Sequence, residues 1–314
     1  MRPHDSLSAV GNTPLIRLSQ FEPRNGAEIW LKLEGGNPTG SYKDRMAVAV
    51  LGSALARGDV KPGDRVVEYT GGSTGTALAF VSAVLGLRFT AVFSDAFSDS
   101  KRAAMQAFGA EVLVEPSENG RITPELIARM KARAYALAKE PGSYYADQFG
   151  SPDVRAGYEP MGREIVNALG TDIDMIVAAV GTGAALMGTV DGLRAAGANP
   201  AVIALEPLQS ALLTTGKGGP HKIEGIGVGF VPPFIDQSQL REVRAIDQER
   251  AFAMCRRLAR EAGVFCGGST GLNVAAAVDL AAEIGPGKRI VTLGCDSGNK
   301  YLGGHIYGQD VGAD

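Results

Sequence analysis

The 314-residue chain lacks the features that mark membrane and nucleic-acid proteins. No apolar run is long enough to span a bilayer, and residues 1–10 contain no apolar stretch of the kind that secretion signals carry. The formal net charge is −3 and the basic residues form no block, which argues against nucleic acid or an anionic membrane as the main partner. We therefore expect a cytoplasmic protein whose partner is a small molecule.

Residues that bind metals or form disulfides are also scarce. The chain has three cysteines, Cys255, Cys266 and Cys295, which lie far apart and show no CxxC spacing. Its three histidines are equally scattered. Neither a zinc site nor a disulfide framework is indicated, so we predict no metal site and a reducing compartment.

Glycine, by contrast, is abundant, with 42 residues, many of them in turns that follow apolar segments. The apolar segments read as strands and alternate with segments that read as helices, which is the signature of parallel sheets covered by helices. A change of composition at residues 148–160 suggests two α/β domains, residues 1–150 and a larger one at residues 151–314. The strand-like segments are 65–69, 89–93, 111–115, 173–180, 201–205 and 289–293, and the helix-like ones include 76–85, 99–108, 184–195, 248–262 and 272–284.

Lys43 lies in a polar stretch between a strand-like segment, 29–34, and a small apolar helix-like one, 46–55. Ser41 and Asp44 have the spacing of a capping box, which places Lys43 in the first turn of the helix. The partial positive charge at a helix N-terminus disfavours an ammonium ion and favours the neutral amine. Schiff-base chemistry with a carbonyl cofactor requires that neutral amine. The alternative is that Lys43 points into water, as most lysines do.

Three strand-to-helix turns, at residues 70–75, 181–185 and 266–271, consist mainly of glycine, alanine, serine and threonine. In an open parallel sheet such turns lie at the carboxyl ends of strands, where ligands bind. The hydroxyl-rich turn 70–75 suits a carboxylate, and its glycines allow its N–H groups to turn toward the ligand and the loop to close. The turn 181–185 offers N–H groups at a helix N-terminus to a phosphate. Each could instead be an ordinary turn, and Ser269 in the third no more than a helix cap.

A dinucleotide site is a further reading of the second turn. Gly181 and Gly183 begin a pattern like the dinucleotide fingerprint, and Glu206 ends the next strand at about the distance that a ribose contact requires. The third glycine is missing, because that position is Leu186, which is too large for close packing of helix on sheet. The sequence therefore does not favour NAD.

Taken together, these stretches resemble the fold-type II pyridoxal-phosphate enzymes, close to cysteine synthase (O-acetylserine sulfhydrylase) and cystathionine β-synthase. The resemblance runs from Gly11-Asn12-Thr13-Pro14-Leu15 to Ser297-Gly298 and is most specific at residues 37–45, Asn-Pro-Thr-Gly-Ser-Tyr-Lys-Asp-Arg. It implies a tryptophan synthase β-like fold of two α/β domains, each a mostly parallel sheet flanked by helices. It also implies pyridoxal 5′-phosphate between the domains, residues 11–36 packed on the second domain, and a homodimer.

The resemblance also implies roles for individual residues. Lys43 takes the role of the Schiff-base lysine and of the general base. The cofactor would be bound by a phosphate cup and by two serines, namely Gly181, Thr182, Gly183, Ala184 and Ala185 with Ser73 and Ser269, the last at the pyridine nitrogen. The amino-acid substrate would be bound by Thr70, Gly71, Gly72, Ser73, Thr74 and Gln148, with Gly225 in a neighbouring active-site segment, 221–227.

Several positions depart from the sulfhydrylase pattern. Ser73 stands where that enzyme has an asparagine, and Gly71 where it has a serine. Ala184 and Ala185 replace a glycine and a threonine of the phosphate cup. Asp296 lies near a position where sulfhydrylases carry serine and cystathionine β-synthase carries aspartate. These changes leave the cofactor assignment intact and the substrate pair open.

The activity that the resemblance implies is β-replacement on an activated L-serine, O-acetyl- or O-phospho-L-serine, through an aminoacrylate, with sulfide giving L-cysteine. One alternative is another nucleophile, as in cystathionine β-synthase or in specialised amino-acid synthesis. A second is β-elimination of the serine or threonine dehydratase type. A third, a ligand sensor without catalysis, would have no need of Lys43.

Overall fold

The computed structural model describes residues 5–308, which form two compact units. The first contains the described residues up to Val10 together with Lys43–Gly157, and the second contains Gly11–Tyr42 and the residues from Tyr158 onward. The first unit therefore ends at residue 157 rather than 150, because helix α5 (Pro152–Ala156) packs on helix α1 (Lys43–Arg57). The early segment of the second unit extends to residue 42 rather than 36, because the Tyr42 N–H donates to the Cys295 carbonyl at 3.0 Å.

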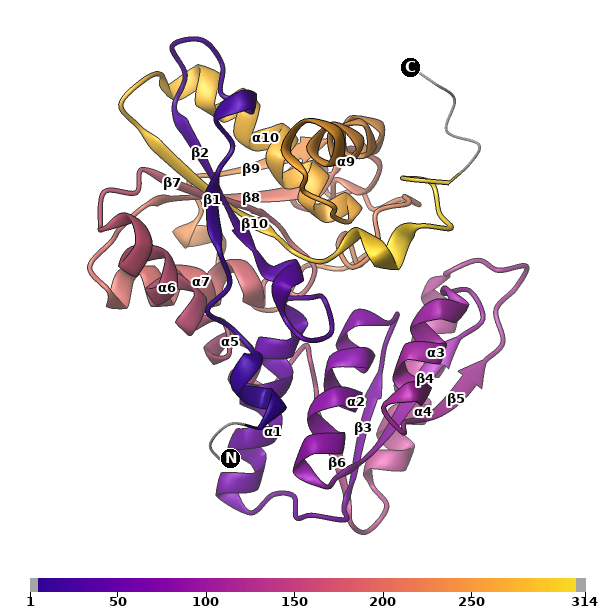
Figure 1. The fold of residues 1–314 in the computed structure, drawn as a ribbon. Coiled ribbons are helices and arrows are strands. Elements are labelled where there is room, and N and C mark those ends of the chain that lie inside the picture. Colours follow the sequence, from indigo (N-terminus) through magenta and orange to yellow (C-terminus); the bar gives the residue numbers. More distant parts are fainter. Residues whose placement is uncertain (1–4, 309–314) are drawn as a thin grey trace. The chain divides into compact units, whose positions relative to one another are not determined.

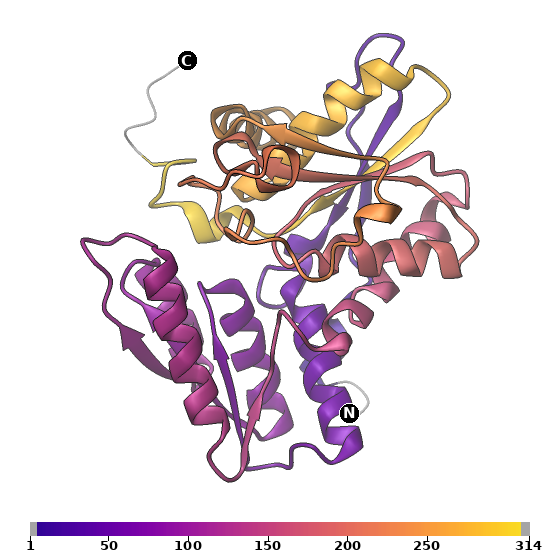
Figure 2. The same cartoon turned by 180° about the vertical axis from the view of Figure 1, so that it is seen from behind.

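The first unit is built on a sheet of four parallel strands, in the order β5-β4-β3-β6. Its strands are β3 (Arg65–Tyr69), β4 (Arg88–Ser94), β5 (Glu111–Glu115) and β6 (Ser143–Tyr145), and its further helices are α2 (Ser73–Leu85), α3 (Asp99–Ala107) and α4 (Pro124–Ala138). Helix α2 packs between α1 and α3 and lies on β3 and β4, as Figure 1 shows. Helix α4 packs on the same sheet and is seen in front in Figure 2.

The second unit is built on a six-stranded sheet, in the order β1-β2-β10-β7-β8-β9. Only β1 runs antiparallel to its neighbour. Helices α9 and α10 pack together on one face, and α6 and α7 pack together on the other (Figure 1). The strands are β1 (Leu15–Arg17), β2 (Glu28–Leu33), β7 (Met175–Ala179), β8 (Ala201–Pro207), β9 (Glu242–Ile246) and β10 (Arg289–Gly294), and the helices are α6 (Glu159–Leu169), α7 (Ala184–Ala195), α8 (Leu212–Thr215), α9 (Gln248–Ala262) and α10 (Gly268–Ile284).

The predicted fold class, two mostly parallel sheets flanked by helices, is confirmed. Two strands were not expected from the sequence, β6 and β9. Both lie at a sheet edge and have few buried residues, so neither carries the apolar run that marks a central parallel strand. The edge position of β6 matters for the site, because the chain leaves this strand directly before Gln148.

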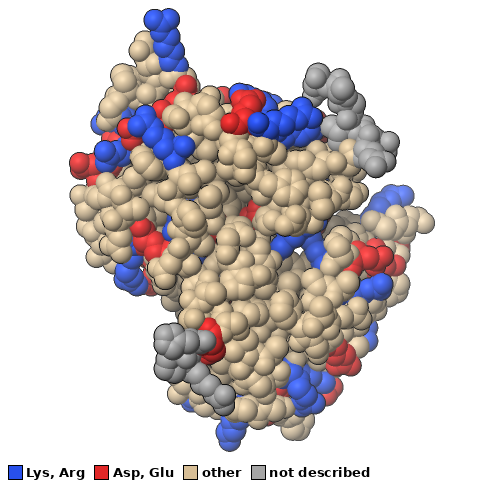
Figure 3. Space-filling model, viewed as in Figure 1, with Lys and Arg blue, Asp and Glu red and all other residues tan. Residues whose placement is uncertain are grey.

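On the face that Figure 3 shows, lysine and arginine are interspersed with aspartate and glutamate. Among residues 5–308, every helix is too short or too polar to cross a membrane. The same residues contain no cluster of histidine, cysteine and carboxylate groups that could hold a metal ion.

Candidate active site

Lys43 is the first residue of α1, so the position in the first turn that the sequence predicts is confirmed. The side chain is half-buried, and the next two residues, Asp44 and Arg45, are buried. Burial of this turn follows from the apolar face of α1, which continues through Met46, Ala47 and Val50. Lys43 is therefore held at a defined place on the first unit, and it is not a surface lysine surrounded by water.

The turn Thr70–Gly75 follows β3 and leads into α2, at the carboxyl end of the strand. The buried Thr70 hydroxyl oxygen accepts the N–H groups of Gly72, at 3.0 Å, and Gly75, at 3.1 Å. Thr70 and the Gly72 N–H are thus used to shape the turn, although both were expected to face a carboxylate. The N–H groups that remain without a protein acceptor among residues 5–308 are those of Gly71, Ser73 and Thr74.

The structure brings two predicted substrate residues together. The Thr74 hydroxyl donates to the Gln148 side-chain oxygen at 2.8 Å, and the Gln148 amide donates to the Tyr69 carbonyl at 3.0 Å. Both side chains are buried, and they are 74 residues apart in sequence. We call this pair together with the three N–H groups of the turn after β3 the clamp.

Two of the three glycines of the turn, Gly71 and Gly72, lie against neighbouring side chains. A Cβ atom at Gly71 would lie 3.0 Å from the ring of Phe97, and one at Gly72 would fall on the buried side chain of Lys101, on α3. Gly72 also has a φ of 138°, which side chains rarely adopt. These glycines therefore also permit close approach, since a serine at position 71 would require the Phe97 ring to shift, and the mobility of the loop stays a prediction.

The proposed phosphate cup lies on the second unit, where β7 leads into α7. Gly183 precedes the helix with a φ of 86°, which favours glycine. The Thr182 hydroxyl oxygen accepts the Ala184 N–H at 3.2 Å, and the first helical bond runs from Met187 to Gly183. The N–H groups of residues 184–186 thus precede the helical ladder and carry its positive dipole end. This geometry suits an anion such as a phosphate.

Two further predicted segments lie against this cup within the second unit. A Cβ atom at Gly181 would fall on the Gly225 carbonyl oxygen, and the Gly227 N–H donates to the Val180 carbonyl at 3.3 Å. A Cβ atom at Gly268 would lie 3.3 Å from Ile223. The segment 221–227 therefore contacts both the cup and the turn that carries Ser269, and at Gly181 only glycine permits the approach.

Ser269 is not a helix cap. Helix α10 begins at Gly268, its N-cap is Gly267, and no side chain caps it. Ser269 lies in the first turn, is 6% exposed, and its hydroxyl has no hydrogen-bond partner among residues 5–308. The hydroxyl oxygen is not among the fully buried atoms that lack a partner, so it still reaches the surface of the site and can bond a ligand atom. The cap interpretation is therefore wrong, and the hydroxyl is available to a ligand.

Asp296 lies beside the same turn. Its carboxylate accepts the Tyr301 hydroxyl at 2.6 Å, and a Cβ atom at Gly267 would fall on Asp296 and on the Tyr301 ring. Burial, and next the charge of Asp296, raise the pKa of Tyr301 well above its ordinary value. Tyr301 therefore stays protonated and remains a hydrogen-bond donor. Asp296, which departs from the sulfhydrylase pattern, is therefore held in place by its hydrogen bond with Tyr301.

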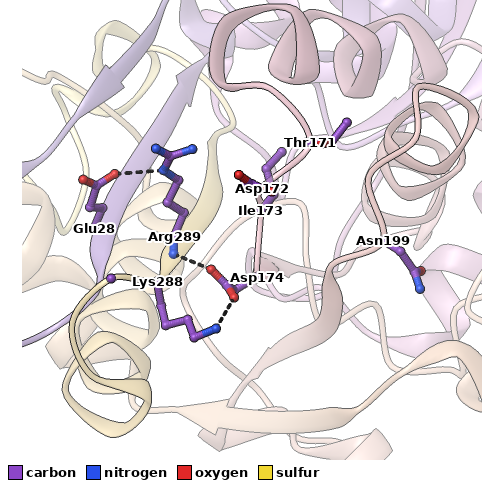
Figure 4. Close-up of a pocket in the computed structure, with 9 residues that line it drawn as sticks. Glu28, Thr171, Asp172, Ile173, Asp174, Asn199, Lys288 and Arg289 are labelled. Carbon is purple, nitrogen blue, oxygen red and sulfur yellow. Dashed lines mark hydrogen bonds and ion pairs between the residues drawn. The ribbon is translucent and has the colours of Figure 1, made fainter.

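A separate polar pocket of about 490 Å³ lies at the amino ends of the strands of the second unit (Figure 4). Its charged groups bond to one another: Lys288 lies 2.9 Å from Asp174, the Arg289 N–H donates to Asp174 at 2.9 Å, and the Arg289 side chain lies 3.3 Å from Glu28. Because ligands of open parallel sheets bind at the carboxyl ends of the strands, we read this pocket as a surface ion-pair network.

Sequence reasoning missed three residues that shape the clamp, namely Glu68, Phe97 and Lys101. Glu68 had a detectable signal, because it is an acid inside an apolar strand directly before the glycine turn. Phe97 and Lys101 had none, since they follow another strand and reach the turn only through the packing of α3 beside α2.

Comparisons with known proteins show the family of the chain. A family model described as pyridoxal-phosphate dependent enzyme matches residues 7–296. A cysteine synthase of Staphylococcus aureus is 34% identical over 312 residues, which cover 98% of this chain and 99% of that protein. An O-ureido-L-serine synthase of Streptomyces lavendulae is 36% identical over 311 residues, which cover 98% and 94%. The crystal structure of an O-acetylserine dependent cystathionine β-synthase from Helicobacter pylori has a TM-score of 0.89 at 33% identity, over 98% of this chain and 99% of that one. With its whole length aligned, its fold shared and its lysine at the head of α1, the chain belongs to the family of pyridoxal-phosphate dependent enzymes.

Proposed function

We propose that the protein is a cysteine synthase-like transferase, which exchanges the β-substituent of an activated L-serine, O-acetyl- or O-phospho-L-serine, for a nucleophile, with sulfide giving L-cysteine. The observation that carries the proposal is the clamp, in which the bonded pair Thr74 and Gln148 lies beside the turn that follows β3. The three N–H groups of that turn and the second hydrogen of the Gln148 amide are neutral donors that suit a carboxylate. Relatives named cysteine synthase and O-ureido-L-serine synthase support the same reaction class.

Pyridoxal phosphate is the cofactor of the family, and the residues of this chain fit it. The N–H groups at the head of α7 would hold the phosphate, and the unpartnered Ser269 hydroxyl would meet the ring nitrogen. When bound, the cofactor delocalises negative charge at the substrate Cα, which allows a β-substituent to leave.

The clamp, Lys43 and Ser269 have separate roles in this reaction. The clamp holds the α-carboxylate and fixes the direction of the Cα–H bond. The Lys43 amine would hold the cofactor through its carbonyl group, and as a free amine it would take the Cα proton as general base. The Ser269 hydroxyl is neutral and leaves the ring nitrogen largely unprotonated, which favours expulsion of a β-substituent over transamination.

The reaction is tested by incubating the enzyme with O-acetylserine or O-phosphoserine and with sulfide, homocysteine or small amines in competition. We expect a β-substituted amino acid as the main product, with cysteine formed from sulfide. Because Ser73 is smaller than the asparagine of sulfhydrylases, we expect Ser73→Asn to lower the use of the larger nucleophiles relative to sulfide. Pyruvate and ammonia as main products in the presence of every nucleophile would instead identify a dehydratase-type lyase.

Ser269 gives a second test of the site. We expect Ser269→Ala to weaken cofactor binding and slow proton removal, because the ring nitrogen of the cofactor would lose its hydrogen-bond donor. The loss of such a bond costs roughly 1–3 kcal/mol of binding free energy. Ser269→Asp should protonate the ring nitrogen, shift the cofactor absorbance and change how the reaction partitions between replacement and side products. Thr214→Ala is the matched control, because that hydroxyl bonds Glu206 outside the cup. Unchanged spectra and kinetics in both Ser269 variants would contradict the assignment.

We further propose a cytoplasmic homodimer. Cys255, Cys266 and Cys295 are all buried free thiols, which is consistent with a reducing compartment. Light scattering of the purified protein measures the oligomeric state directly.

A further inference from the structure

Glu68 is a carboxylic acid with no exposed surface, and the mechanism above does not use it. It lies in β3, one residue before Tyr69. One of its oxygens accepts the Tyr69 N–H at 3.1 Å, and the other accepts the Gln148 N–H at 2.9 Å. A fully buried carboxyl group is costly, so its presence at the base of the clamp requires a reason.

The path of the chain after β6 explains the second bond. The ladder between β3 and β6 continues to Ala146, whose N–H donates to the Val67 carbonyl at 3.1 Å. Asp147 then turns the chain out of the sheet with a φ of 51°, which non-glycine residues rarely adopt. The next N–H, that of Gln148, has left the ladder and needs an acceptor inside the protein. The Glu68 side chain supplies it.

Two adjacent residues of β3 therefore hold Gln148 at both ends. Glu68 binds its backbone, and the Tyr69 carbonyl binds its side-chain amide, which leaves the side-chain oxygen to accept the Thr74 hydroxyl. We propose that Glu68 is a positioning residue of the carboxylate clamp, which fixes the Gln148 backbone so that the Gln148 amide and the Thr74 hydroxyl form one rigid surface. This inference rests on the proposed role of the clamp in binding the substrate carboxylate.

The protonation state of Glu68 decides which substitution best tests its role. Burial raises the pKa of Glu68 to about 8, and the charge of Asp147 also raises it, while the two N–H groups and the Tyr145 hydroxyl lower it. A protonated carboxyl group retains a lone pair on each oxygen, so both N–H bonds persist in either state. A glutamine amide nitrogen cannot accept a hydrogen bond. Glu68→Gln therefore has nearly the same shape as the wild type, but its NH2 group would face the N–H of either Tyr69 or Gln148.

We expect Glu68→Gln to raise KM for O-acetylserine, and the dissociation constant of a non-reactive carboxylate ligand, by about tenfold, the ratio that follows when a buried donor loses its acceptor. The cofactor dissociation constant should stay within twofold, because the clamp lies in the first unit and the phosphate cup in the second. Glu111→Gln is the matched control, since Glu111 is an exposed acid of the edge strand β5 that accepts the Thr90 hydroxyl. It should leave all three constants unchanged.

A double-mutant cycle distinguishes positioning from general destabilisation. If Glu68 acts through Gln148, then adding Glu68→Gln to Gln148→Ala should change KM by less than twofold. Full multiplication of the two effects, or a wild-type KM in folded Glu68→Gln, would overturn the proposal. If Glu68→Gln does not fold, Glu68→Asp keeps both acceptor oxygens on a shorter stem, and the same cycle applies to it. A wild-type KM in both Gln148→Ala and Thr74→Ala would refute the proposed clamp itself, an outcome that does not depend on Glu68.

Discussion

Lys43→Ala should abolish turnover and remove the absorbance band of the lysine-linked cofactor. The amine is proposed both to bind the cofactor and to accept the Cα proton. General base catalysis alone contributes about 10²–10⁴-fold, so loss of both roles should leave no measurable rate. The position of Lys43 at the first residue of α1 supports this assignment, because the helix dipole there favours the neutral amine.

Lys61→Ala is the matched control for Lys43, since Lys61 is an exposed lysine in a turn of the same unit. It should keep the activity and the spectrum of the wild type. Borohydride reduction followed by peptide mapping locates the modified lysine in each protein. A reducible cofactor bound to another lysine in the Lys43→Ala variant would show that the centre of the site is elsewhere.

Gly181→Ala should weaken cofactor binding more than any other single change in the phosphate cup. The added Cβ would overlap the Gly225 carbonyl oxygen. Because that oxygen belongs to the backbone, no side-chain rotation can relieve the contact. Forcing extra atoms into such a contact costs about 1–3 kcal/mol, which corresponds to a rise of roughly 5- to 150-fold in the cofactor dissociation constant if the cup moves.

Gly218→Ala provides the comparison. Gly218 lies three residues before the segment 221–227 that contacts the cup, but a Cβ atom there would meet nothing closer than the Ser210 hydroxyl, at 3.8 Å. Its cofactor dissociation constant should match that of the wild type. Titration of cofactor-free protein, followed by absorbance, measures both variants. Equal affinity in Gly181→Ala and the wild type would mean that the cup does not bind the phosphate through this turn.

The sequence alone determined the features that depend on local patterning. Strand and helix alternation follows from apolar periodicity, which a reader can see without the fold. Lys43 was expected in the first turn of an apolar helix and lies there, although α1 begins at Lys43 itself, one residue later than a Ser41 cap implies. Helices α7 and α9 begin and end where the sequence predicts, because glycine and capping residues mark their ends.

The tertiary structure decided which residues share the clamp. The hydrogen bond between Thr74 and Gln148 joins two segments that no local pattern relates, and it depends on the edge strand β6, which lacks an apolar run. The sequence suggested that Gly71 and Gly72 give mobility, which stays a prediction; the approach of Phe97 and Lys101 to these glycines comes from the packing of α3 beside α2 and could not be read from the sequence. The use of Glu68 as the acceptor for Gln148 likewise requires the turn at Asp147. Periodicity and capping act within about one helical turn and can be read along the chain, whereas contacts between distant segments are fixed by sheet order and packing, which only the folded chain defines.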